Sequence, residues 1–212
     1  MRKFFVFLAL LAIAGYLYTH QDLWNSFTNS VGKTLNLPTN PLEGPYAVQM
    51  WGTDSKNGTL RQVIVVNGER WRIEMRQANS PKTIVVVSDG TQVVSNQRPG
   101  FPGDRLDPRP MLTKVFTSAA EFTAAAEKLP SMETVLCDGH TCWAGSTNIG
   151  SASGRIWVDV STGFPVRLGG SMNGATADEH FERIPINFSD AGTAEFFDPA
   201  HTECIFGRFL TR

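Results

Sequence analysis

The chain has 212 residues, of which 42% are hydrophobic and 18% charged, and its formal net charge is −1. This length suffices for one substantial domain with an appendage. The near-neutral charge argues against a nucleic-acid partner, because binding phosphates and releasing their counterions requires a basic surface. The 19 Gly and 12 Pro residues suit a β protein that is rich in turns.

The N-terminus is typical of an export segment. Arg2 and Lys3 precede an unbroken apolar run over 4–14, which ends in small residues that fit a signal-peptide cleavage site. A retained membrane anchor is the alternative, because Tyr16–Tyr18 would lengthen the apolar run. In both cases we expect the folded part to be periplasmic or otherwise extracytoplasmic, either released or anchored through this segment.

A proline-rich stretch separates this segment from the rest of the chain. We expect a signal peptide or membrane anchor over 1–20, a linker or short helix over 21–45, and one folded domain over 46–212. Three prolines between 38 and 45 end any helix in the linker, because proline lacks the N–H that a helix requires.

The segment from Leu60 to Ser95 predicts a run of antiparallel strands. Charged residues between 70 and 76 alternate with Trp71, Ile73 and Met75, so we expect one apolar face and one solvated face. Asn-Gly and Asp-Gly pairs in this segment are typical of tight hairpin turns. A strand that begins at Tyr46 comes first, and the others are expected at about 60–66, 69–77, 82–88 and 91–95.

One helix is predicted from Met111 to Leu129, after a long Pro/Gly loop over 96–110. Pro110 suits the first turn of a helix, and Pro130 ends it. Its apolar residues recur at steps of three and four, so they form a stripe that must pack on the sheet. The stripe consists of Leu112, Val115, Phe116, Ala119, Phe122, Ala126 and Leu129.

A second group of strands follows the helix. A hairpin is expected over 132–147, turned by Asp138-Gly139, and a further pair of strands over 155–171, turned by Ser161–Gly163. The last strand is expected over 180–187. Its Pro185 predicts an edge position, because proline cannot donate to a ladder of hydrogen bonds.

The chain lacks the motifs of the common catalytic sites. It has no glycine-rich phosphate loop, no Gly-x-Ser-x-Gly and no His-Glu-x-x-His. Its carboxylates are spread singly, so spacing alone pairs none of them for acid–base work. We therefore expect neither an enzyme nor a cofactor.

The cysteines allow two interpretations. Cys137 and Cys142 flank a tight turn, and a disulfide between them is favoured because exported proteins meet an oxidising compartment. The alternative is a zinc site formed by these two residues with His140 and Cys204, since four nitrogen and sulfur ligands suit zinc. Cys204 is otherwise expected to be a buried, inert thiol.

Two motifs resemble a known family. Residues 155–168 contain the pattern W-x-D-x-x-T-G-x-P-x-R, and residues 184–188 read Ile-Pro-Ile-Asn-Phe and are followed by the aromatic turn 195–200. Together with the order of elements, these motifs resemble the outer-membrane lipoprotein carrier (LolA/LolB-like) superfamily over about residues 46–200. The resemblance implies a mainly β fold with α: an open, strongly curved antiparallel half-barrel covered by one or two helices.

The same resemblance implies a function. We expect an exported, non-enzymatic carrier or binding protein for lipids, lipoproteins or other amphiphiles in the cell envelope, with an acyl chain or lipoprotein as cargo and a membrane or envelope protein as a further partner. The alternatives are an envelope sensor that binds another protein and, third, an enzyme. The helix would be a lid over a hydrophobic trough, or else part of a permanent core. The expected ligand-binding residues are Trp71, Ile73, Met75, Val115, Phe116, Ala119 and Phe122.

Overall fold

The structure is a computed structural model, which describes the greater part of the chain after residue 43. The described residues are 44–54, 58–78, 80–97, 106–129, 132–149, 152–172 and 175–211. The predicted export segment, and the linker up to residue 43, lie outside them. No helix in the described part of the chain is both long and apolar enough to cross a membrane.

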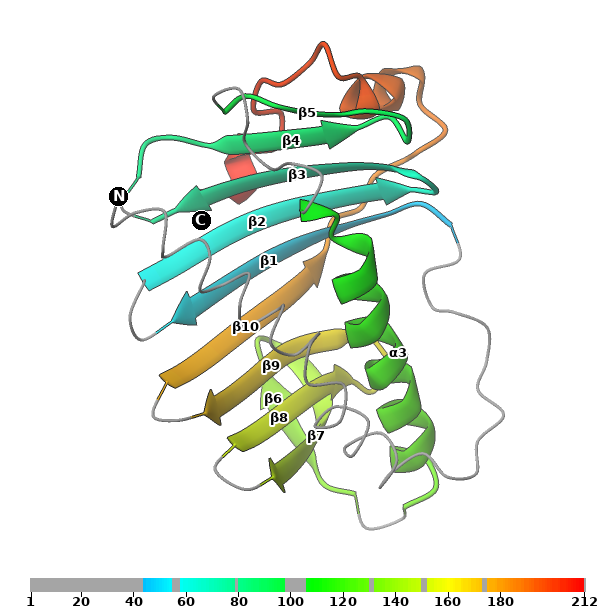
Figure 1. The fold of residues 1–212 in the computed structure, drawn as a ribbon. Coiled ribbons are helices and arrows are strands. Elements are labelled where there is room, and N and C mark those ends of the chain that lie inside the picture. The colour runs from blue at the N-terminus through cyan, green and yellow to red at the C-terminus, as the bar shows by residue number, and fades with distance from the viewer. Residues whose placement is uncertain are drawn as a thin grey trace. The chain divides into compact units, whose positions relative to one another are not determined.

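The described chain is mainly β, with ten strands and one α-helix (Figure 1). The first group of strands comprises β1 (Tyr46–Asp54), β2 (Gly58–Asn67), β3 (Arg70–Gln77), β4 (Ile84–Ser88) and β5 (Val93–Ser95). After α3 (Arg109–Ala126) come β6 (Thr134–Cys137), β7 (His140–Ile149), β8 (Ala152–Asp159), β9 (Pro165–Met172) and β10 (Ala175–Arg183). Two 3₁₀ helices follow, η2 (Ala191–Phe197) and η3 (Gly207–Phe209).

The strand order is β5-β4-β3-β2-β1-β10-β9-β8-β7-β6, so by its hydrogen bonding the sheet is open. The pairings that the structure describes are antiparallel. The chain divides into two compact units, which we describe separately. The meander unit spans Leu42–Pro110 and Ala177–Arg212, and the described part of the helix unit lies within Met111–Thr176.

The sheet of the meander unit has two faces, which the register defines. Ile64 of β2 pairs with Ile73 of β3, which in turn pairs with Val86 of β4, so these side chains share one face. We call it the apolar face. Its buried hydrophobic residues are Val48, Met50, Leu60, Ile64, Val66, Trp71, Ile73, Met75, Val86 and Phe181.

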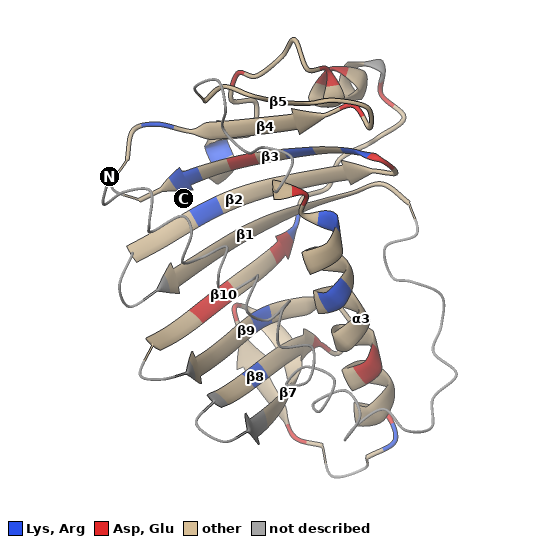
Figure 2. Cartoon of the chain, viewed as in Figure 1, with Lys and Arg blue, Asp and Glu red and all other residues tan. Residues whose placement is uncertain are grey.

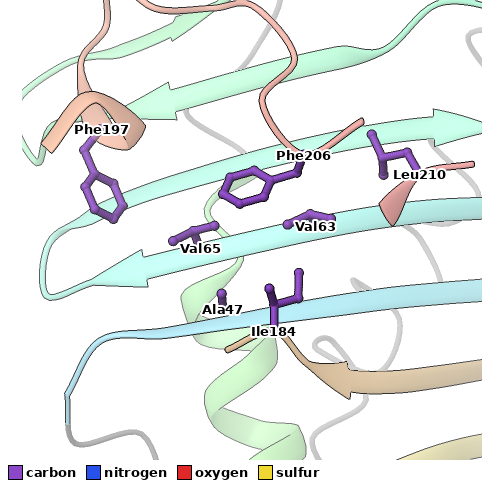
Figure 3. Packing of buried hydrophobic residues seen from close by; sticks show 7 residues of the cluster. All are labelled: Ala47, Val63, Val65, Ile184, Phe197, Phe206 and Leu210. Carbon is purple, nitrogen blue, oxygen red and sulfur yellow. The ribbon is translucent and has the colours of Figure 1, made fainter. Parts of the chain in front are cut away.

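The opposite face, which we call the covered face, packs against the C-terminal part of the chain. Val63 and Val65 of β2 lie on it and are fully buried. Figure 3 shows the aromatic and aliphatic side chains of the C-terminal segment that cluster with these valines. The buried cluster consists of Ala47, Val63, Val65, Ile184, Phe197, Phe206 and Leu210.

The expectation of a solvated face on the predicted meander is therefore wrong. Arg72 and Glu74 of β3 lie on the covered face, and both side chains have an exposed fraction of 0%. Arg70 alone of this series is exposed, while Arg76 is half-buried. In Figure 2, β3 is marked in both charge colours, whereas β1 and β4 are almost entirely tan. The alternation of charged and apolar residues correctly indicates a strand, but the C-terminal segment covers the charged side.

The two buried charges neutralise each other and bind the segment that covers them. Arg72 Nε donates to Glu74 Oε1 at 2.8 Å, and the guanidinium also donates to the carbonyl oxygens of Phe196, His201 and Glu203. The Glu74 carboxylate accepts the backbone N–H groups of Ile205 and Phe206, each at 2.8 Å, and the Cys204 thiol at 3.1 Å. Because buried charges are tolerated only when they are paired and hydrogen-bonded, this network accounts for both residues.

The last strand also differs from its prediction. β10 begins earlier than expected and ends at Arg183, before Pro185. It has a neighbour on each side in the strand order, so the predicted edge position is wrong. Pro185 interrupts no ladder, because the last backbone bond to β1 is made by Ile184, whose N–H donates to Ala47 O at 2.9 Å.

The helix unit consists of β6–β9 and α3. The stripe of α3 packs on the sheet, since Ala119 and Phe122 form one buried cluster with Ile156 and Val158 of β8. Phe116 makes a second contact, a tilted ring pair with Phe164 at 5.3 Å between centroids. The helix ends at Ala126, so Leu129, the last residue of the predicted stripe, lies beyond it and is 53% exposed.

The buried ion pair gives the first prediction. We expect Arg72→Met to lower the free energy of unfolding by about 3–5 kcal/mol, because the Glu74 carboxylate would stay buried without its charged partner. Denaturant titration followed by circular dichroism measures this loss.

Arg70→Met, on the same face of the same strand, is the matched control. Arg70 is exposed and lies 5.1 Å from the centroid of the Phe197 ring, so we expect a loss of only about 0.5–1 kcal/mol. Equal losses in the two variants would contradict the role given to the buried pair.

Candidate functional site

The apolar face of the meander unit contains three of the predicted ligand-binding residues. Trp71, Ile73 and Met75 of β3 are 2–4% exposed and lie on this face together, as their alternation predicted. The face continues over five adjacent strands, from β4 to β10.

The other four predicted residues lie on α3 in the helix unit. Val115, Phe116, Ala119 and Phe122 are at most 8% exposed. The contacts described above place Phe116, Ala119 and Phe122 against residues of the same unit. No residue from 111 to 126 is fully exposed, and the side of the helix opposite its apolar stripe is partly buried.

Glycine at one strand position lets the helix lie close to the sheet. A Cβ atom built on Gly145 of β7 would lie 2.4 Å from the ring of Phe122, far inside a normal contact. The ring therefore occupies the space that any other residue at 145 would fill.

Two half-buried carboxyl groups accompany these apolar surfaces, and no sequence pattern singled them out. Burial raises the pKa of Glu179 on β10, and the neighbouring Asp178 adds to this effect. Burial also raises the pKa of Glu121 on α3, whose Oε2 atom is shielded and has no hydrogen-bond partner among the residues that the structure describes. In the sequence Glu179 follows Asp178 in a polar stretch and Glu121 stands among alanines on the helix, and neither pattern is specific to a binding site.

The W-x-D-x-x-T-G-x-P-x-R motif, residues 157–167, forms the hairpin between β8 and β9. Asp159 Oδ1 accepts hydrogen bonds from the backbone N–H and hydroxyl groups of both Ser161 and Thr162, at 2.6–2.9 Å. Gly163 has a φ of +68°, which favours glycine. The side chains of these residues form hydrogen bonds within the turn and stabilise it, so the motif has a structural role here.

The same carboxylate is held as an anion. Its burial opposes ionisation, but the hydrogen bonds from Ser161, His140 and Thr162 outweigh burial and hold the pKa of Asp159 well below its ordinary value. His140 Nδ1 lies 2.8 Å from Asp159 Oδ2, which connects this turn with the β6–β7 hairpin.

The predicted Cys137–Cys142 disulfide is not present in the structure, where all three cysteines are free. Cys137 pairs with His140, and Cys142 with Val135, so the two thiols are diagonal neighbours. Such neighbours have Cα atoms about 7–8 Å apart, more than a disulfide usually spans. Burial, chiefly, raises the pKa of Cys142 to about 12, so its thiol stays protonated near neutral pH.

The structure also bears on the expectations for Cys204 and for a metal site. Cys204 is an exposed residue, contrary to expectation, although its thiol donates to Glu74. Burial and the hydrogen bond to that carboxylate raise its pKa to about 11. Among the described residues, no group of three or more His, Cys, Asp or Glu side chains is arranged to hold a metal ion.

Comparisons with known proteins find similarity only at the level of structure. No protein-family model and no curated protein matches the sequence. LprF from Mycobacterium bovis is 11% identical with a TM-score of 0.43, over 69% of this chain and 90% of its own. An uncharacterized conserved protein from Thermus thermophilus is 13% identical with a TM-score of 0.38, over 69% and 82%. PNGF-II is 10% identical with a TM-score of 0.29, over 73% and 29%. At such values these similarities assign the chain neither a family nor a function.

The close approach at Gly145 gives the second prediction. We expect Gly145→Ala to lower the free energy of unfolding by about 1–3 kcal/mol, because the new methyl group overlaps the Phe122 ring. Thermal and denaturant melts measure the loss, and Phe122→Leu in the same background should recover part of it. Gly192→Ala is the control, since a Cβ atom there meets nothing within 4 Å. A neutral Gly145→Ala variant would contradict this packing.

The hairpin carboxylate gives the third prediction, which concerns pH. Because the pKa of Asp159 is lowered in the folded state, its stabilising contribution is present above the unfolded value of about 3.9 and is lost as the pH falls below it. We expect the melting temperature of the wild type to fall more steeply with acid than that of Asp159→Asn, with the exposed Glu182→Gln as control. Parallel curves for wild type and Asp159→Asn would contradict this assignment.

Proposed function

We propose that this chain is an extracytoplasmic, non-enzymatic binding protein for the acyl chains of lipids, lipoproteins or other amphiphiles. The single observation that carries the proposal is the apolar face of the meander unit, which extends over five strands and contains Trp71, Ile73 and Met75. The sheet already has a hydrophobic cluster with the C-terminal segment on its other face. The apolar face is therefore a second large hydrophobic surface in a unit that has a core without it.

The sequence supports the rest of the proposal. The basic and apolar start of the chain favours export, and the order of elements resembles the LolA/LolB-like carriers, whose open half-barrel binds amphiphiles. In this proposal the sheet is strongly curved, and α3 forms the lid through Val115, Phe116, Ala119 and Phe122. Binding requires no catalytic group, because burial of acyl surface supplies the driving force.

A protein-binding role is the second candidate, and one observation favours it. β6 ends the strand order, and its Leu136 is 80% exposed. A strand at the end of a sheet offers unpaired backbone groups, to which an extended segment of another protein can add. Loss of partner capture in Leu136→Lys, with amphiphile binding unchanged, would favour this role.

The cargo itself is the most direct test. Purified full-length protein is extracted with organic solvent, and the extract is analysed by mass spectrometry for lipid in stoichiometric amount. A fluorescent fatty-acyl probe then measures binding to the delipidated protein. Absence of both lipid and probe binding would contradict the proposal.

The fourth prediction separates a ligand-binding helix from a purely structural one. We expect Phe116→Ala to weaken binding of the acyl probe several-fold and to cost less than the roughly 3–5 kcal/mol typical of a buried phenylalanine in a packed core. Phe206→Ala is the matched control, because Phe206 belongs to the cluster on the covered face. It should cost the full amount and leave probe binding unchanged. A large loss of stability with unchanged binding in Phe116→Ala would make the helix structural.

A further inference from the structure

One acidic side chain lies on the apolar face. Glu179 of β10 pairs with Gly52 of β1, beside the pair formed by Phe181 and Met50. Residues two apart on a strand point to the same side, so Glu179 shares the face of these two buried side chains. Glu179 is the one carboxylate at the paired positions of this face. These positions are the alternate residues, counted from the first, of 46–52, 60–66, 71–77, 84–88 and 177–183.

The neighbouring strand leaves space for this side chain. A Cβ atom built on Gly52 would lie 3.1 Å from Glu179 Cγ and 3.3 Å from the carbonyl oxygen of Asp178, closer than ordinary contacts. Glycine at this position therefore lets the Glu179 side chain lie across β1. A larger residue would force it to move, so the two positions act together.

Glu179 has no hydrogen bond or ion pair with the described residues, whereas the buried carboxylate of the unit, Glu74, is paired. Glu74, on the covered face, is matched by Arg72 and two backbone N–H groups. Arg183 is the one basic residue at the same positions of the apolar face. It is exposed and lies four residues along the strand, about 13 Å away. The carboxyl group is half-buried beside apolar side chains, and burial raises its pKa, so a hydrogen-bond donor or a positive charge next to it would be favourable.

We propose, building on the amphiphile-binding function above, that Glu179 recognises the polar end of the ligand and selects amphiphiles with an amine or another hydrogen-bond-donating head group over fatty acids. An ammonium group supplies both the donors and the charge that the carboxylate lacks. A hydroxyl group supplies one donor. A fatty acid would bring a second carboxylate to the same place, where two like charges repel.

The test uses three probes of equal chain length, dodecylamine, dodecanol and dodecanoate. Each is titrated below its micelle concentration into the purified, delipidated full chain, and binding is followed by calorimetry. We expect affinity to fall in the order amine, alcohol, acid. In Glu179→Gln we expect the affinity for the amine to fall about tenfold or more, because a charge-assisted hydrogen bond is lost, while the affinity for the acid stays the same or rises.

Glu182→Gln is the matched control, because Glu182 is an exposed carboxylate on the opposite face of the same strand. It should leave all three affinities unchanged, and its melt and that of Glu179→Gln should resemble the wild type. The order of affinities in the wild type is a second test, which does not depend on any variant folding.

Two negative results can be told apart. If all three probes bind but neither the order of affinities nor the effect of Glu179→Gln appears, the selection by Glu179 is wrong and the binding function stands. An equal loss of amine affinity in Glu182→Gln would likewise overturn it, as a general charge effect. If no probe binds the wild type, the proposed function fails and this inference fails with it.

Discussion

The buried ion pair between Arg72 and Glu74 is the interaction on which the meander unit depends. Two adjacent charges on one strand face would make that face unsuitable as a core if they were solvated. Paired with each other and bonded to the backbone of residues 196–206, they instead hold the C-terminal segment against the sheet. That segment forms no strand, so side chains of the sheet supply the hydrogen bonds that a ladder would otherwise provide.

This arrangement gives the two faces different roles. The covered face is filled by Phe197, Phe206 and Leu210 from within the unit. The apolar face carries a comparable set of hydrophobic side chains with one half-buried carboxyl group, Glu179, among them. In a permanent core such a carboxyl group would lower stability, because burial of an acceptor without a donor opposes folding. On a binding surface a ligand can provide the donor, and this links the proposed function with the proposed selectivity.

Local sequence patterns determined most of the secondary structure. Alternation around Trp71, the turn residues and the stripe of α3 indicated the strands and the helix, because each pattern reflects contacts between near neighbours in the chain. The Asp159 hairpin belongs to the same class, since its hydrogen bonds join residues two or three positions apart. The selection of Trp71, Ile73 and Met75 as members of one face followed from the same period of two.

Tertiary structure alone decided which surfaces are buried. The sequence placed Arg72 and Glu74 in solvent because a charged residue on a strand is usually exposed, and only the return of a segment some 130 residues later covers them. The edge position inferred from Pro185 failed for the same kind of reason, because the strand stops before the proline and β1, one of its two neighbours, comes from a distant part of the sequence. The position of Glu179 opposite Gly52 likewise depends on the pairing of strands remote in the sequence, which a local pattern does not specify. The sequence by itself thus determined the elements and their apolar sides, and the packing of remote segments decided which of those sides became a core.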